Sequence, residues 1–301
     1  MNDNSVSFSQ DIFNELLLQT DDTVQSMTGK PASYFGLPSP DRCTASVTCK
    51  ELLRKQSYDK AELENYVAVN EPLLMPDQQV AYDHIIQVAQ RADTGIVFID
   101  APGGTGKTFL FNLILAKICI TGIAIAVSSS GIAATLLQGG QTAHSTFKLP
   151  LNLSHTESPV CNIARGSGLA LLLQCCQLIV WDECTMSHKG ALEFVDRTLR
   201  DLRKGDQLMG GIPLLLSGDF RQTLPVIPRG TLADELNACL KSSYLWRHIK
   251  VLHLQTNIHV RLLGDATSHD FARELLRIGE GEIPVNAESG TIELAELLSS
   301  L

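Results

Sequence analysis

A glycine-rich run in the first half of the chain has the composition of a phosphate-binding loop. Residues 101–108 read Ala-Pro-Gly-Gly-Thr-Gly-Lys-Thr. Glycines let a chain curl so that its backbone N–H groups point at phosphate oxygens. The Lys107 ammonium can reach the β- and γ-phosphates of a nucleotide, and the Thr108 hydroxyl can bind magnesium. Since the usual first glycine of this pattern is Ala101 here, we expect the curvature at Gly103, Gly104 and Gly106.

Two adjacent acids follow an apolar run later in the chain, in the sequence QLIVWDE at 177–183. We expect Asp182 to hold a magnesium ion, through water, and Glu183 to take the proton from an attacking water molecule. Neighbouring carboxylates repel each other unless a cation lies between them, which also favours a metal. The alternative is an acidic strand end exposed to solvent, and the glycine-rich loop weakens it.

A third apolar run ends in Ser-Gly-Asp at 217–219, with Gln222 three residues on. A polar side chain beside a γ-phosphate can respond to its presence or absence. Gln222 is the candidate for that role, whereas Asp219 is expected to fix the turn or a water network. Either residue could instead cap the loop.

The elements that must position these residues alternate between two patterns. Short apolar runs that predict buried parallel strands lie at 95–100, 123–127, 177–182, 212–217 and 251–254. Helical spacing occurs at 78–91, 107–119 and 131–137, and again through residues 192–202. This alternation predicts an α/β fold with a mostly parallel central sheet and flanking helices. In such sheets, ligand chemistry lies at the carboxyl ends of the strands.

Composition limits the class of protein. The chain has 301 residues, 44% of them apolar, and a formal net charge of −9. That charge argues weakly against a nucleic-acid partner but does not exclude one, because a narrow basic strip, stacking and backbone amides can hold a strand. The eight cysteines form no C-x-x-C pair, so we expect reduced thiols in an intracellular protein. No secretory signal or membrane span is expected.

Four motifs in order resemble the PIF-one type of superfamily-one DNA helicases, and most closely those encoded by Helitron transposons. They are GGTGKT, the block SSSGIAATLL-GG-TAHSTF, WDE and GDFRQTLPV, and the resemblance spans residues from about 71 to 290. It implies two RecA-like domains, a P-loop NTPase domain being the first. It also implies an ATP hydrolase with ATP and Mg²⁺ as cofactors, moving 5′ to 3′ on single-stranded DNA or at DNA forks. Roles in DNA repair, recombination and telomere maintenance, and a nuclear location, are implied in the same way.

The resemblance also assigns residues. Gln78 matches the glutamine that reads the adenine edge, and Glu183, Lys107 and Gln222 match the catalytic positions. Thr108 and Asp182 match the metal ligands. The nucleotide-binding loop would comprise Gly103, Gly104, Thr105, Gly106, Lys107 and Thr108, and the DNA-binding residues would be Ser129, Ser130, Thr142, His144, Ser145 and Phe147. Hydroxyls would meet phosphates, and Phe147 or His144 could stack on a base. Alternatively, the hydroxyls cap neighbouring helices and Phe147 belongs to the core.

We expect three parts in the chain: a poorly defined leader at 1–70, the ATPase domain at 71–252, and the start of a truncated second helicase domain at 253–301. Short helical patterns lie at 11–18 and 60–67. The family has an arginine where His259 stands, and Arg261 two positions on could replace it. With the later motifs missing, we expect ATP binding, feeble hydrolysis and no unwinding.

Two other readings remain beside the helicase. One is a truncated transposon-derived P-loop module that binds nucleotide or DNA without unwinding. The other is a P-loop kinase or an unrelated NTPase, which does not account for TAHSTF or GDFRQTLP.

Overall fold

A parallel β-sheet forms the centre of the molecule. The computed structural model describes residues 30–40, 58–91, 94–150, 161, 163, 167–222, 225–258 and 266–282, with isolated positions between 13 and 28. The six strands are β1 (Ile96–Asp100), β2 (Ala124–Ser128), β3 (Gln141–Thr142), β4 (Leu178–Asp182), β5 (Leu214–Gly218) and β6 (Ile249–His253). Their order in the sheet is β3-β2-β4-β5-β1-β6, and all pairs are parallel. The predicted α/β class is confirmed.

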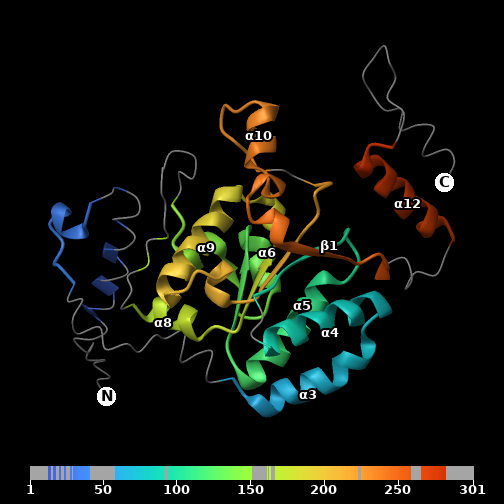
Figure 1. Cartoon of the computed structure of the whole chain (residues 1–301), viewed down its shortest axis with the longest axis horizontal. Coiled ribbons are helices and arrows are strands. Elements are labelled where there is room, and N and C mark those ends of the chain that lie inside the picture. The colour runs from blue at the N-terminus through green and yellow to red at the C-terminus, as the bar shows by residue number, and fades with distance from the viewer. Residues whose placement is uncertain are drawn as a thin grey trace, which may run out of the picture.

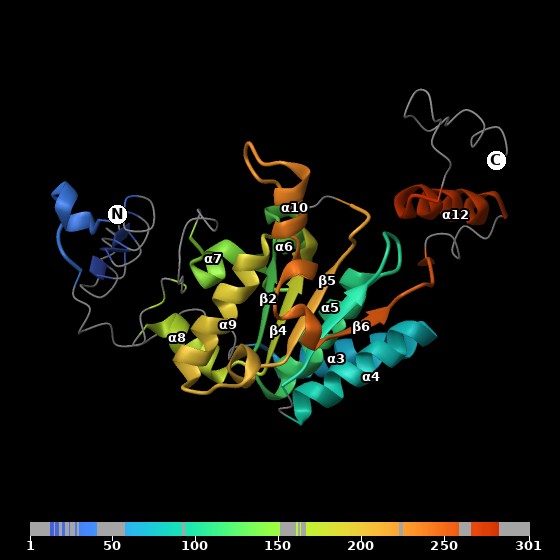
Figure 2. The ribbon, with the colours of Figure 1, turned by 45° about the horizontal axis from the view of Figure 1, so that its top comes forward.

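Helices cover both faces of this sheet (Figures 1 and 2). One face carries α3 (Lys60–Asn70), α4 (Pro76–Gln90) and α5 (Lys107–Thr121), and the other carries α7 (Ala143–Phe147), α8 (Gly168–Cys175) and α9 (Lys189–Arg203). The remaining helices are α6 (Gly131–Leu136), α10 (Leu232–Ala238) and α12 (Ala266–Glu280). Short 3-10 turns lie at Ala32–Phe35, Glu71–Leu73, Cys184–Met186, Leu208–Gly211, Leu240–Ser242 and Trp246–His248.

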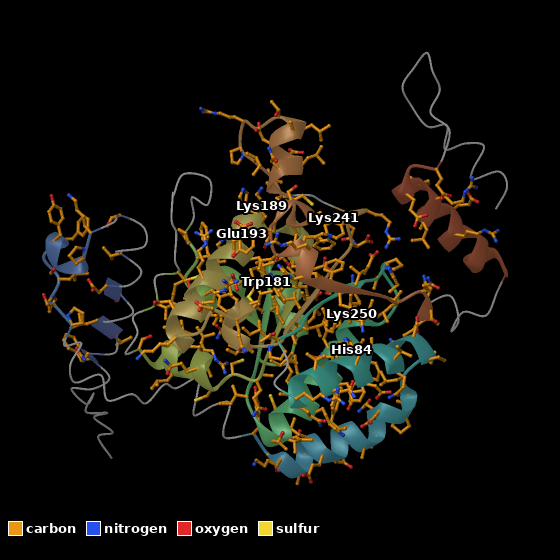
Figure 3. The ribbon with its side chains drawn as sticks, viewed as in Figure 1. His84, Trp181, Lys189, Glu193, Lys241 and Lys250 are labelled. Atoms are coloured by element: carbon orange, nitrogen blue, oxygen red, sulfur yellow. The ribbon has the colours of Figure 1, made fainter. Side chains whose placement is uncertain are left out.

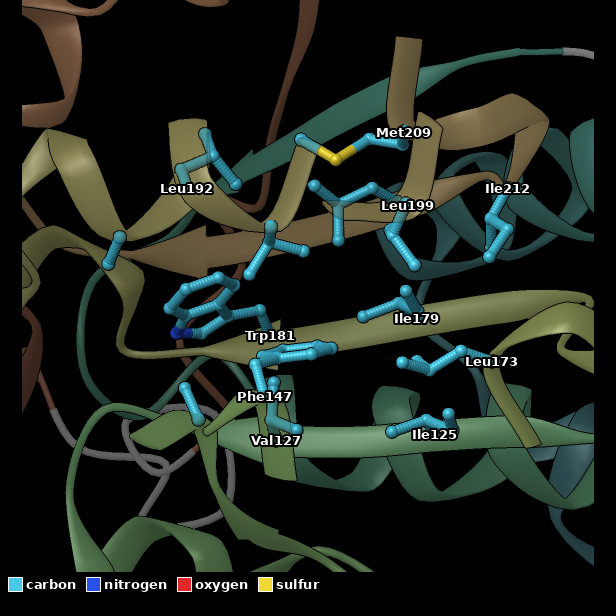
Figure 4. Packing of buried hydrophobic residues seen from close by; sticks show 14 of the residues in the cluster. Ile125, Val127, Phe147, Leu173, Ile179, Trp181, Leu192, Leu199, Met209 and Ile212 are labelled. Atoms are coloured by element: carbon cyan, nitrogen blue, oxygen red, sulfur yellow. The ribbon is translucent and has the colours of Figure 1, made fainter. Parts of the chain in front are cut away.

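The strands are apolar on both sides because helices bury both faces of the sheet. Alternate residues of one strand therefore enter two separate cores: Ile179 and Trp181 of β4 face α8 and α9, whereas Leu178 and Val180 face α5. Trp181 belongs to the first core (Figure 3), and the Phe147 ring lies beside it (Figure 4). This packing fixes β4 and so the acids at its end.

The amino-terminal boundary of the ATPase domain differs from our prediction. We placed residues up to 70 in a leader, but α3 packs against α5 and its Leu63 and Val67 side chains are 5% and 4% exposed. Asp59 caps this helix by accepting hydrogen bonds from the N–H groups of Ala61 and Glu62. The domain therefore includes the helix that begins at residue 60. Of the predicted helix at 11–18, the described positions 13, 14, 16 and 17 are helical.

The described cysteines are free thiols, as we predicted. They are Cys119, Cys161, Cys175, Cys176, Cys184 and Cys239, most of them buried. Cys43 and Cys49 lie outside the described residues. No helix in the ranges given above is long and apolar enough to cross a membrane.

Candidate active site

The polar residues singled out in the sequence meet at the carboxyl ends of three neighbouring strands, β4, β5 and β1. Lys107 Nζ lies 3.8 Å from Glu183 Oε1, which joins the loop after β1 to the loop after β4. The Ser217 hydroxyl at the end of β5 donates to Asp182 Oδ1 at 2.5 Å. The lysine, the two acids and the third strand tip therefore share one site.

The loop between β1 and α5 is curled by two glycines. Gly104 has φ +82° and Gly106 has φ +74°, a region that only glycine enters at little cost. Gly103 lies in the turn of the loop, as we expected, but its φ is not positive, so its backbone is one that other residues can adopt. Lys107 Nζ donates to the carbonyl oxygen of Ala101 at 2.9 Å, across the mouth of the loop. The Lys107 ammonium therefore lies over the loop, where a phosphate would be bound.

Gln78 joins the start of α4 to this loop. Its side-chain oxygen accepts the N–H of Met75 at 3.0 Å, and its amide nitrogen donates to the carbonyl of Thr105 at 2.8 Å. The side chain is 1% exposed. In this conformation both ends of the amide are bonded to backbone, so an adenine contact at Gln78 requires one of these bonds to be exchanged. Its role in reading adenine stays a prediction.

The two acids after β4 have different surroundings. Asp182 is 4% exposed, and its Oδ1 accepts the backbone N–H of Glu183 at 3.0 Å in addition to the Ser217 hydroxyl. Glu183 has φ +51°, a left-handed conformation that is uncommon for this residue type and is typical of functional sites. Its Oε2 atom is buried without a hydrogen-bond partner.

The charge state of Glu183 follows from this setting. Burial raises the pKa of its carboxyl above the ordinary value, the Lys107 ammonium opposes the rise, and the charges of Asp182 and Asp219 add to it. A carboxylate with a raised pKa is a stronger base than an ordinary one. The geometry therefore suits Glu183 for proton abstraction.

The loop after β5 is organised around Arg221, a residue that the sequence pattern does not single out. Arg221 Nε donates to Asp219 Oδ1 at 2.7 Å, and its other nitrogens reach Asp100 at the end of β1 and Glu280 at the end of α12, at 3.4 and 3.3 Å. Asp219 also accepts a bond from Gln222 Nε2 at 3.3 Å. The only sequence signal was a charged residue between the two polar residues we had chosen.

The segment after β2 is tied to β4 by hydrogen bonds. The Ser129 N–H donates to the Asp182 carbonyl at 3.2 Å, and the Ser129 hydroxyl accepts the indole N–H of Trp181 at 3.1 Å. The same hydroxyl lies 2.7 Å from that of Ser187. The Ser130 hydroxyl caps α6 by accepting the Ala133 N–H. These hydroxyls serve the fold, and contact with DNA stays a prediction for both serines.

In the TAHSTF segment, the predicted DNA-stacking role of Phe147 is wrong. Phe147 is 1% exposed and its ring centroid lies 5.8 Å from that of Trp181 (Figure 4), so its ring is core and is not presented for stacking on a base. Thr142 caps α7 by accepting the Ser145 N–H at 3.2 Å. His144 is half-buried, which lowers its pKa, and Ser145 is exposed. His144 and Ser145 remain candidates for DNA contact.

Comparison with known families assigns the chain. The family model described as PIF1-like helicase matches residues 73–289. The chain belongs to this family. The resemblance noted from four motifs is thereby confirmed.

The PIF1-like helicases that resemble this chain are longer than it is. It is 31% identical over 159 residues to the ATP-dependent DNA helicase Pif1 of Psychrobacter, which is 52% of this chain and 24% of that protein. It is 27% identical over 268 residues to the ATP-dependent DNA helicase RRM3 of Saccharomyces cerevisiae, which is 85% of this chain and 35% of that protein. The chain thus spans about a quarter to a third of the length of these relatives.

The fold of the PIF1-like helicases is shared as well. The Bacteroides Pif1 helicase solved with ADP-AlF3 and ssDNA aligns with a TM-score of 0.57 at 22% identity, over 68% of this chain and 46% of that one. Pif1 helicase from Candida albicans aligns with a TM-score of 0.56 at 21% identity, over 70% and 45%. The central sheet is therefore the RecA-like domain that the family implies. His259 and Arg261, the two candidates for the missing arginine, lie outside the described residues.

Proposed function

We propose that this chain is the ATP-binding part of an ATP-dependent DNA helicase that couples hydrolysis to movement along single-stranded DNA. The observation that carries the proposal is the meeting of Lys107, Glu183 and Asp182 at adjacent strand tips. The relatives support it, since they are named ATP-dependent DNA helicases and a solved neighbour contains ADP-AlF3 and ssDNA.

The residues fit a magnesium-bound nucleotide. The described part of the chain has no group of three or more His, Cys, Asp or Glu that could cage a metal. Magnesium at nucleotide sites is held by one or two protein oxygens together with phosphate oxygens and water, and Asp182 and Thr108 offer that set. When bound, magnesium neutralises charge on the phosphate oxygens. Asp182 is suited to hold it because Ser217 and the Glu183 N–H fix its carboxylate.

The other residues divide the chemistry of hydrolysis between them. Lys107 would exchange the Ala101 carbonyl for phosphate oxygens, because an ammonium gains more from a phosphate than from a neutral carbonyl. The backbone N–H groups of Gly104 and Gly106 would contribute to the cradle of the phosphates. The Glu183 carboxylate would take the proton of the attacking water. Gln222, held by Asp219, would respond to the γ-phosphate.

DNA binding is proposed for the segments at the carboxyl ends of β2 and β3, through Ser129, Ser130, Thr142, His144 and Ser145. These segments leave the same edge of the sheet as β4, and Ser129 is bonded to the backbone of Asp182. A strand bound there would lie directly beside the catalytic acids. Polarity of 5′ to 3′, action at forks, roles in repair, recombination and telomere maintenance, and a nuclear site of action are proposed from the family.

The test is ATP hydrolysis by the 301-residue chain with and without single-stranded DNA, together with titration of a fluorescent nucleotide. Lys107→Ala should weaken nucleotide binding, whereas Lys60→Ala, an exposed lysine at the start of α3, should not. If wild type and Lys107→Ala bind the nucleotide equally well, the loop that carries Lys107 is not the nucleotide-binding site. Nucleotide or DNA binding with no DNA-stimulated hydrolysis would favour the alternative, a P-loop module that binds without unwinding.

A further inference from the structure

One arginine lies between carboxylates at the tips of β5 and β1. The two strands pair in parallel with Asp100 opposite Gly218, so their carboxyl ends lie at the same edge of the sheet. Arg221 Nε donates to Asp219 Oδ1 at 2.7 Å, and Arg221 Nη2 donates to Asp100 Oδ1 at 3.4 Å. Asp100 directly precedes the loop that would hold the phosphates. The Arg221 guanidinium therefore joins that loop to the loop at 219–222.

A third contact of Arg221 reaches a helix that follows the last strand of the sheet. Arg221 Nη1 donates to Oε1 of Glu280, the last residue of α12, at 3.3 Å. A Cβ atom added to Gly279 would lie 3.3, 3.4 and 3.5 Å from Cβ, Cδ and Cγ of Arg221. The end of α12 therefore contacts both the charged group of the arginine and its apolar stem.

Asp219 connects Arg221 to Gln222. Its Oδ1 atom accepts the backbone N–H and the Nε–H of Arg221, at 3.0 and 2.7 Å, and its Oδ2 atom accepts from Gln222 Nε2 at 3.3 Å. Burial raises the pKa of Asp219, but its hydrogen bonds and the charge of Arg221 outweigh burial, so the pKa lies below its ordinary value. An ionised carboxylate only accepts hydrogen bonds, so the Gln222 amide keeps its nitrogen toward Asp219.

We propose that Arg221 is a positioning residue for ATP hydrolysis: held by the end of α12, its guanidinium orients Asp219 and, through Asp219, the Gln222 amide. This inference rests on the proposed function, because it needs Gln222 to respond to the γ-phosphate. It makes full turnover depend on contact between α12 and the loop at 219–222. In the competing reading, the ion pairs of Arg221 hold α12 in place and have no effect on hydrolysis.

Arg221→Gln removes the charge and keeps a polar side chain. If Arg221 positions Gln222, kcat falls roughly 10-fold to 100-fold, because a small displacement of a catalytic group is enough for such a loss. KM for ATP should stay within about twofold, since the lost interaction acts on the transition state. Affinity for ADP with aluminium fluoride should fall, and affinity for ADP alone should not. A lower melting temperature with unchanged kcat and unchanged aluminium fluoride affinity would overturn the inference.

Glu280→Gln tests the contribution of α12 and keeps the test decisive if Arg221→Gln does not fold. The Glu280 side chain is 46% exposed, so the chain should tolerate the change. Because an exposed ion pair is weak, kcat should fall only about twofold to fivefold. In an Arg221→Gln background the same change should have no further effect. A wild-type kcat for Glu280→Gln, or an equal loss in both backgrounds, would contradict the proposal.

Glu274→Gln is the matched control on the same helix. The Glu274 carboxylate pairs with Arg277 at 2.9 Å. Its loss should leave kcat unchanged, whereas a defect equal to that of Glu280→Gln would trace the effect to weakening of α12 in general and overturn the inference. Absence of any hydrolysis by the wild-type chain would count against the proposed function itself. Equal hydrolysis by wild type and Arg221→Gln would count against this inference alone.

Discussion

At the scale of single residues, the acid pair shows how two neighbouring carboxylates acquire different roles. Asp182 is fixed by two hydrogen bonds to one oxygen, which suits a metal ligand that must not move. Glu183 keeps one oxygen free, is strained in its backbone and has a raised pKa. Strain and an unpaired oxygen are costs to folding, and their coincidence on one residue argues for a chemical role.

Glu183→Gln tests that role. The amide cannot accept a proton from water, so turnover should fall by roughly 10²–10⁴, the usual contribution of a general base. Nucleotide affinity should stay close to that of the wild type, because Lys107 and the loop backbone are untouched. Steady-state ATP hydrolysis and fluorescent nucleotide titration measure the two quantities.

The control for this change is Glu64→Gln on the exposed face of α3, which should alter neither quantity. A Glu183→Gln variant that hydrolyses ATP at the wild-type rate would show that another group is the base. Such a result would leave the metal and phosphate assignments standing, since they do not depend on the proton.

Residue types identified most of this site, but not how the side chains are oriented. Lys107, Asp182 and Glu183 were predictable because strand and loop patterns place them without ambiguity. Phe147 was assigned to DNA because an aromatic beside hydroxyls suits stacking, and only the structure shows that its ring faces Trp181. Arg221 carried no recognisable spacing, since two of its ion-pair partners, Asp100 and Glu280, are distant in sequence.

At the scale of elements, the turn before α5 depends on one glycine more than on the others. A Cβ atom on Gly106 would lie 2.6 Å from Ile258 Cδ1 and 2.7 Å from Gln78 Nε2, and the residue has positive φ. Gly103 has no neighbour within 4 Å of an added Cβ and needs no such backbone. Substituting each glycine in turn therefore distinguishes a position that requires glycine from one that does not.

Gly106→Ala should destabilise the loop, with a left-handed backbone cost of roughly 1–2 kcal/mol before the steric overlap is counted. Gly103→Ala should leave the melting temperature of the nucleotide-free chain unchanged. Thermal unfolding of the two variants, followed by circular dichroism, measures the contrast. Equal melting temperatures would mean that the loop reshapes freely around the added methyl group.

The segment after β6 is hydrogen-bonded to the loop before α5 and to the first turn of α4. Asp77 accepts the N–H groups of Gln255 and Thr256, each at 2.9 Å, and Ile258 donates to the Gly104 carbonyl at 2.9 Å. Burial raises the pKa of Asp77, but the backbone N–H groups of Thr256, Gln255 and Gln78 outweigh it, so the pKa lies below the ordinary value. Ionised Asp77 therefore stabilises the folded chain at pH values above the ordinary pKa of an aspartate. This contribution is lost as the pH falls through the lowered pKa of Asp77 in the folded state.

Elements with a strong pattern were predicted to within one or two residues, and elements defined by long-range contacts were not. β1, β4 and β5 follow apolar runs, and α5 begins where the glycines end. β3 is two residues long and exists only because it pairs with β2. The helical pattern at 60–67 predicted α3, but it did not reveal that Leu63 and Val67 pack on α5.

At the scale of the whole molecule, stability depends on a carboxyl group buried outside the candidate active site. Asp196 of α9 is fully buried and accepts bonds from the Met209 N–H at 2.6 Å and the Tyr244 hydroxyl at 2.8 Å. It also pairs with Arg200 at 2.9 Å. One carboxylate thus joins α9 to the turn before β5 and to the segment that precedes β6.

Asp196→Ala should lower the free energy of unfolding by about 2–4 kcal/mol, because the Met209 N–H and the Tyr244 hydroxyl are left unsatisfied inside the protein. Denaturant unfolding measures the change. Asp206→Ala, at an exposed aspartate beyond the same helix, is the control and should shift stability by less than about 0.5 kcal/mol. If Asp196→Ala also lowers the free energy of unfolding by less than about 0.5 kcal/mol, water has entered the site and replaced the carboxylate.

The strand order has a consequence for biosynthesis. In the sheet that the structure describes, β1 pairs with β5 and β6, so it has no strand to pair with until Leu214 and the residues after it have left the ribosome. β2 and β4 can pair before then. During translation the loop at 101–108 is therefore displayed on an unpaired segment for more than a hundred codons, the interval between Ile96 and Leu214. Nascent chains arrested in that interval should be cleaved by protease near β1, and longer ones should be protected.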